Sequence, residues 1–96
     1  MSKITFIARM TVKEGREEEF IGYCRELIAH VRKNEPGVLY YDFFRLREPR
    51  RYAVIESFPD EPTEHAHMGS AKLAEIAPKI GDCLDGTWER EYFDPL

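Results

Sequence analysis

The chain has 96 residues, of which 43% are hydrophobic and 12% aromatic, a composition that fits a single compact domain over residues 1–96. Its 14 basic and 18 acidic residues leave a net charge of −4, the opposite of the positive surface that DNA and RNA binding requires. The first residues lack the apolar stretch of a signal peptide, and no run of 18 apolar residues occurs, so we expect a cytoplasmic protein with no nucleic-acid or membrane partner.

The first half of the chain predicts a strand, a helix and a second strand. Residues 3–12 alternate between two sides, as in a half-buried strand. After Gly15, apolar residues recur at steps of three and four, which indicates an amphipathic helix that ends at Pro36-Gly37. Residues 38–46 are rich in aromatic and branched side chains and predict the next strand, which a polar turn at 47–50 follows.

The second half predicts a strand, a broken helical region and a last strand. Residues 52–58 are extended again and complete a hairpin. Asp60 can cap a second helical region, and Gly69-Ser70 divides that region into two pieces, with Ser70 capping the second piece. After Gly86, residues 87–93 form the last predicted strand.

This order of elements is that of a ferredoxin-like α+β fold, βαββαβ, with a four-stranded antiparallel sheet and all helices on one face. The opposite face then exposes Ile7 and every second residue of 38–46, a patch too apolar to remain in water on a stable monomer. A chain this short also buries only a modest core. We therefore expect a homodimer in which two such faces are paired.

Four segments of the chain resemble the antibiotic biosynthesis monooxygenase family of dimeric α/β barrels: FIARMTVKEGREEEF, the EPG at 35–37, YAVIESFPDEPTEHAHMGS and LDGTWEREYFDP. The likeness spans nearly the whole chain. It implies one of several activities, among them metal- and flavin-free oxidation of quinols or polyketide phenols, haem degradation and isomerisation of a signal molecule. Haem degradation is disfavoured, because the first strand has no asparagine and His67 stands about where the haem-degrading members carry a tryptophan.

His67 matches a histidine that recurs in this family, and it is the candidate catalytic residue. A neutral imidazole can take a proton from a phenol or enol, and Glu64, three residues earlier on the same side of the helix, could orient the ring. The alternative is a histidine that caps or hydrogen-bonds at the helix break. The family resemblance also implies a pocket between sheet and helices, for which we expect Phe6, Met68 and Trp88 as walls around a small aromatic molecule.

Glu56 interrupts the apolar side of its strand, so its carboxylate must be either paired or functional. Because the family places a similar arginine and glutamate on these strands, we expect a structural ion pair of Glu56 with Arg45 or Arg9 near the dimer interface. A catalytic role for Glu56 is the alternative.

No metal or cofactor site is predicted. His65 and His67 are two residues apart, so on a helix they point about 200° apart and cannot chelate one ion. The chain has no GxGxxG, Walker loop, nucleophile elbow or CxxCH. The leading hypothesis is a cofactor-independent monooxygenase for a small phenol, quinol or polyketide-like aromatic. The alternatives are an isomerase or other proton-shuttling enzyme for a small carbonyl compound, and a non-catalytic dimer that binds a small ligand.

Overall fold

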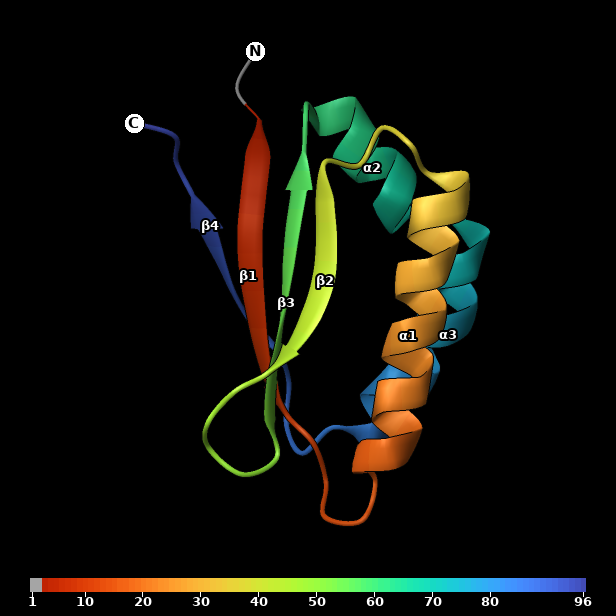
Figure 1. Cartoon of the computed structure of the whole chain (residues 1–96), viewed down its shortest axis with the longest axis vertical. Coiled ribbons are helices and arrows are strands. Elements are labelled where there is room, and N and C mark those ends of the chain that lie inside the picture. Colours follow the sequence, from red (N-terminus) through yellow and green to blue (C-terminus); the bar gives the residue numbers. More distant parts are fainter. Residues whose placement is uncertain (1–2) are drawn as a thin grey trace.

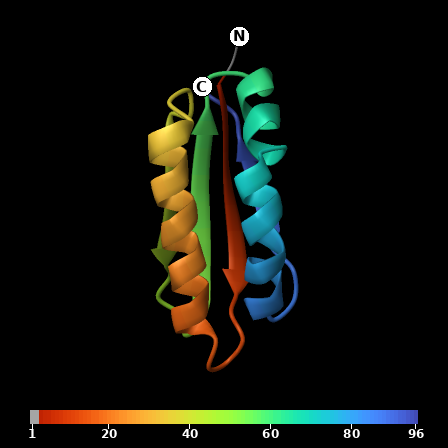
Figure 2. The same ribbon diagram turned by 90° about the vertical axis from the view of Figure 1, so that its right-hand side faces the viewer.

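The computed structural model describes residues 3–96 and shows one sheet with helices packed along one of its faces (Figure 1); the turned view looks onto these helices with the sheet behind them (Figure 2). The elements are β1 (Ile4–Thr11), α1 (Glu17–Asn34), β2 (Tyr40–Arg45), β3 (Arg51–Phe58), α2 (Glu61–Met68), α3 (Ala71–Cys83) and β4 (Glu89–Phe93). Neighbouring strands pair antiparallel in the order β2-β3-β1-β4. The predicted α+β class, element order and one-sided placement of the helices are confirmed.

The break between α2 and α3 lies where the sequence predicted it. The Asp60 side chain accepts a hydrogen bond from the Thr63 backbone N–H at 2.9 Å and caps α2, and Ser70 accepts one from the Leu73 N–H at 3.3 Å and caps α3. Gly69 ends α2 between them. These caps fix the last turn of α2, and with it the position of His67, against the sheet.

The core fills the space between the sheet and the helices. Its largest side chains come from β1, α1, β3 and α3, and include Phe6, Met10, Phe20, Leu27, Phe58, Ile76 and Ile80. Removing each from water stabilises the fold by about 1.5–3 kcal/mol. Within this apolar layer Glu56, Glu64 and His67 are buried polar residues, so each of them requires an explanation of its own.

The other face of the sheet carries no helix from the described residues 3–96 (Figure 1). The register pairs Ile7 with Ile55 on this open face, and Tyr40, Phe44 and Phe93 lie there with 42%, 40% and 43% of their surface exposed. The apolar surface that the strand pattern predicted is therefore present. Along residues 3–96, none of the helices is long and apolar enough to cross a membrane.

Candidate functional site

His67 lies in the last turn of α2 with its side chain turned toward the sheet, and it is almost completely buried. Its ring meets Tyr41 of β2 edge-on, with centroids 4.9 Å apart, and lies tilted against Phe58 of β3 at 5.7 Å. The two aromatic rings fix the plane of the imidazole, so that its two nitrogens point in defined directions.

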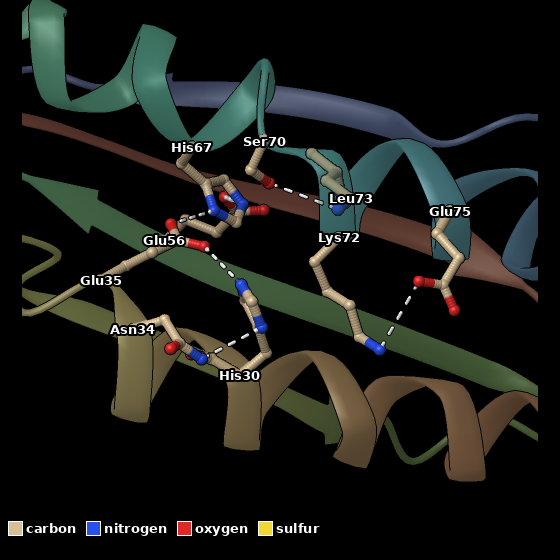
Figure 3. A network of polar contacts seen from close by, with 9 residues as sticks. All are labelled: His30, Asn34, Glu35, Glu56, His67, Ser70, Lys72, Leu73 and Glu75. Atoms are coloured by element: carbon tan, nitrogen blue, oxygen red, sulfur yellow. Dashed lines mark hydrogen bonds and ion pairs between the residues drawn. The ribbon is translucent and has the colours of Figure 1, made fainter.

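Two carboxyl groups flank the imidazole of His67 (Figure 3). Nδ1 is 2.7 Å from Oε1 of Glu35, which directly follows α1, and Nε2 is 3.5 Å from Oε1 of Glu56 on β3. Because the nearer carboxylate accepts a hydrogen bond, we assign the ring hydrogen of neutral His67 to Nδ1. Nε2 then presents a lone pair on the side of Glu56, the arrangement that a general base needs.

Glu56 differs from an ordinary glutamate because it is buried. Burial raises the pKa of Glu56 to about 8, while the Arg90 guanidinium opposes that rise and the carboxylates of Glu64 and Glu35 add to it. Its Oε1 atom has no hydrogen-bond partner among residues 3–96. At neutral pH the protonated form of this carboxyl group is therefore favoured, and it makes no hydrogen bond to His67 through Oε1.

A cavity of about 80 Å³ lies beside these groups, between the sheet and the helices. Glu56 and His67 contribute its polar wall, together with Arg90 of β4, and Met68 and Trp88 belong to its lining. The remaining wall is apolar and is formed by Ala8, Leu27, Tyr41, Phe43, Val54, Leu73, Ala77 and Ile80. The structure thus brings together three of the residues predicted for the site, His67, Met68 and Trp88.

Phe6, which was predicted as a wall of the pocket, is not among the residues that line this cavity. Phe6 is fully buried in the core, where its ring packs against Tyr92 with centroids 5.2 Å apart. The guanidinium of Arg90 lies 4.5 Å above the same ring and takes the position toward the cavity. Arg90 was not among the site residues predicted from the sequence. Strand alternation could have indicated it, because its register partner Ala8 points to the helical side of the sheet. It places a fixed positive charge in the cavity wall.

Within the subunit, Glu56 forms no ion pair with Arg45 or Arg9. Arg9 leaves the sheet on its open face, where it donates a hydrogen bond to Glu91 at 3.1 Å, whereas Glu56 points toward the helices. Arg45 lies opposite Tyr52, four residues from Glu56 along β3, and donates to the Tyr52 hydroxyl at 3.3 Å. A separation of four residues along a strand is about 13 Å, too far for an ion pair.

Glu64 does not orient His67, although it lies on the same helix and is buried. It accepts a hydrogen bond from the Tyr92 hydroxyl at 2.9 Å and so ties α2 to β4. The orienting group is Glu35, which lies 32 residues from His67 in the sequence. No local pattern could have indicated this contact, because it depends on the tertiary packing of the end of α1 beside α2.

The remaining histidines and cysteines do not form a metal centre. Among residues 3–96, no group of three His, Cys, Asp or Glu side chains is arranged to hold a metal ion. His65 is exposed on the outer side of α2, away from His67, as the helical spacing predicted. Cys24 and Cys83 are free and buried, and burial raises the pKa of both thiols.

The chain is similar to known proteins both in sequence and in structure. Residues 3–79 match the family model described as antibiotic biosynthesis monooxygenase. Among proteins of curated function, none is significantly similar in sequence.

Several solved structures share the whole fold. A Caulobacter crescentus protein named for the same family is 27% identical, with a TM-score of 0.94 over 99% of this chain and 91% of that chain. A conserved Methanosarcina mazei protein is 29% identical, with a TM-score of 0.88 and coverage of 98% and 93%. A Bacteroides thetaiotaomicron protein of unknown function, described as a possible oxidoreductase, is 25% identical, with a TM-score of 0.83 and coverage of 96% and 98%.

Proposed function

Because the chain belongs to the antibiotic biosynthesis monooxygenase family, we propose that it oxidises a small phenol or quinol with O₂, without a cofactor. The observation that carries the proposal is the buried His67, whose Nδ1 is held by Glu35 while its Nε2 lies beside the cavity next to Glu56. This is the geometry of a positioned base facing a mostly apolar site, whose outer wall is formed by the exposed Trp88 and Arg90.

The chemistry assigned to the protein is proton removal and charge stabilisation. Nε2 of His67 takes the phenol proton, because a phenolate passes an electron to O₂ more readily than a phenol does. Arg90 stabilises the oxyanion, and the cavity keeps water out. Oxygen joins a ring carbon that carries hydrogen, ortho or para to the phenolate oxygen, and the hydrogen of that carbon passes to the peroxide as a proton. The resulting hydroperoxide loses its terminal hydroxide, which leaves as water, so that one phenol and one O₂ give one quinone and one water.

The size of the cavity limits the substrate. Pockets for drug-sized ligands measure about 300 Å³ or more, whereas this cavity is about 80 Å³. Trp88 is 40% exposed and Met68 is partly buried, so these two walls can move more easily than the core residues behind them. A single aromatic ring therefore fits the site better than a polycyclic polyketide.

Oxygen uptake by metal-stripped protein, measured against a panel of single-ring hydroquinones and polyphenols, tests this function. We expect saturable uptake above spontaneous autoxidation, and a loss of about a hundredfold or more in His67→Gln. His65→Gln is the matched control, because His65 is exposed on the same helix. Uptake no faster than the blank for every compound would contradict the proposal, and turnover under nitrogen would favour a proton-shuttling isomerase instead.

We propose further that two subunits pair through their open sheet faces. Tyr40, Phe44 and Phe93 expose large apolar surface there, and pairing removes it from water. Sedimentation equilibrium at micromolar concentration tests the pairing, and we expect twice the 11.3 kDa mass of one chain. A mass of one chain would contradict it.

A further inference from the structure

His67 separates two hollows of the subunit. The cavity that we assign to substrate lies on one side of the ring. On the other side is a groove of about 550 Å³, between the end of α1 and α2, with His30, Glu35 and His67 in its wall. Figure 3 shows His30 reaching from α1 toward Glu35, and Glu35 reaching toward His67. One imidazole therefore contacts both spaces.

Between His67 and the groove, the polar atoms form a continuous series. Nδ1 of His67 is 2.7 Å from Oε1 of Glu35, and Oε2 of Glu35 is 3.6 Å from Nε2 of His30. That Oε2 atom is buried and has no hydrogen-bond partner in the described part of the chain. The His30 side chain, in contrast, is 29% exposed. A small movement of His30 brings the longer of the two gaps to hydrogen-bond length and completes a connection to solvent.

We propose that Glu35 and His30 carry protons between His67 and the water of the outer groove. This rests on the proposed function, in which His67 is the base. Asn34, in the last turn of α1, donates to Nδ1 of His30 at 3.2 Å, so that neutral His30 carries its hydrogen on Nε2, facing Glu35. When Nδ1 of His30 gives up this hydrogen bond and binds a proton from the water of the groove, His30 can pass its Nε2 proton to Glu35.

The path allows the two proton transfers of the reaction to occur separately. Once His67 has taken the phenol proton, both of its nitrogens carry hydrogen. The Nδ1–H bond of His67 then breaks as an O–H bond forms on Glu35. That proton passes to Nε2 of His30, whose hydrogen at this stage lies on Nδ1 after the inward transfer of the preceding turnover, and the Nδ1 proton of His30 goes to the water of the groove. Neutral His67 keeps its hydrogen on Nε2. That hydrogen is given to the departing hydroxide, whose own hydrogen came from the ring carbon that bound oxygen, while His30 and Glu35 return a proton to Nδ1. One proton leaves and one returns in each turnover, and no electrons move along the path.

The other ionisable groups around His67 offer no equivalent route to the groove. Tyr41 of β2 is buried, and burial raises the pKa of its hydroxyl, so it keeps its proton. Glu64 of α2 accepts a hydrogen bond from the Tyr92 hydroxyl of β4 at 2.9 Å. Glu56 of β3 and Arg90 of β4 line the inner cavity instead. Glu35 and His30 are thus the groups placed to connect the ring with the groove.

Exchange of the His67 ring N–H with water, measured by ¹⁵N NMR on histidine-labelled protein, tests the path without any substrate. The chain has three histidines, so the His67 signals are assigned from single variants. His30→Gln keeps a side chain that can hydrogen-bond Glu35 but cannot relay a proton, and we expect exchange at His67 to slow by about tenfold or more. The exposed control His65→Gln leaves it unchanged. An exchange rate in His30→Gln equal to that of the wild type overturns the proposal.

Turnover gives a second measurement that a purely structural role of His30 would not move. In His30→Ala we expect kcat to fall about tenfold with KM unchanged, because His30 does not line the cavity, and imidazole added to the buffer restores the rate. Failure of imidazole to restore it contradicts the path.

The two measurements separate failure of the path from failure of the function. If no phenol is oxidised, the exchange rates still decide whether the path exists. If a phenol is oxidised but the His30 variants exchange normally, the path is wrong and the function stands.

Discussion

Two clusters of ionisable side chains lie on the helical side of the sheet (Figure 3). Each combines two carboxyl groups with one group that is or can become a cation, but one cluster lies near the surface and the other is buried. Around Lys72 of α3, one cationic group lies among the carboxylates of Glu26 and Glu75, which are about half exposed. Around His67, one ring that can become a cation lies between two carboxyl groups, and its side chain is only 1% exposed. The carboxylates of the first cluster are accessible to water and Lys72 is 22% exposed, whereas His67 of the second cluster is withdrawn from water.

This difference shows what each cluster can contribute. Exposed ion pairs of the Lys72 kind contribute little to stability, because water and salt compete with them. Burying charged groups costs several kcal/mol per ion unless they are paired or neutral. The His67 cluster leaves oxygens of Glu35 and Glu56 without hydrogen-bond partners among the described residues, so folding alone does not account for it. Its location beside a cavity favours a role in chemistry.

The largest expected effect is a pH dependence of stability that comes from the buried cluster. Burial raises the pKa of Glu56 to about 8 from its ordinary value of 4.5. The folded state therefore holds this proton more tightly than the unfolded state, so the stabilisation is complete below about pH 4.5 and is lost as the pH rises through 8. The difference corresponds to about 5 kcal/mol in the free energy of unfolding. Urea denaturation between about pH 5 and pH 9 measures it.

Glu56→Gln isolates this contribution, because the amide fills the same space and does not ionise. We expect the variant to lose most of the decline in stability between about pH 5 and pH 9. Glu26→Gln, which removes a carboxylate from the exposed cluster, should keep the decline of the wild type. Equal declines in wild type and Glu56→Gln would show that burial does not hold the Glu56 proton.

A smaller effect is expected on kcat when a carboxylate of each cluster is replaced by an amide. Glu35→Gln can still accept a hydrogen bond from Nδ1 of His67 but removes the negative charge that stabilises the protonated ring. We expect kcat for the best phenol to fall about tenfold to a hundredfold, while KM stays unchanged because Glu35 does not line the cavity. Glu26→Gln, also a carboxylate of α1, serves as the control. A rise in KM with unchanged kcat would mean that Glu35 supports binding and not proton transfer.

The sequence predicted those parts of the site that depend on local order. The Asp60 and Ser70 caps set the ends of the second helical region, and this placed His67 and Met68 beside the sheet. Trp88 was assigned to a strand that begins only at residue 89, yet it still reaches the cavity. The family resemblance singled out these three residues, and the short-range chemistry of turns and caps placed them along the chain.

Contacts between distant segments account for the errors. Glu35 reaches His67 across 32 residues, and no periodicity encodes that approach. Arg9 could have been excluded as a partner of Glu56, because the alternation of the first strand already places Arg9 on the other face of the sheet from the buried Phe6 and Ala8. Phe6 was correctly predicted on the inner side, but the long side chain of Arg90 lies over it, and this depends on the pairing of β1 with β4.

The smallest effect should come from the exposed cluster itself. Lys72→Gln removes the cation that contacts Glu26 and Glu75, yet all three groups remain hydrated, so we expect the denaturation midpoint to stay within error of the wild type. Added salt should not change this result, because screening has already weakened the pair. Calorimetry at low and high ionic strength provides the measurement. A clear loss of stability at both ionic strengths would show that the pair locks α1 to α3, and the contrast with the buried cluster would then rest on the proton of Glu56 alone.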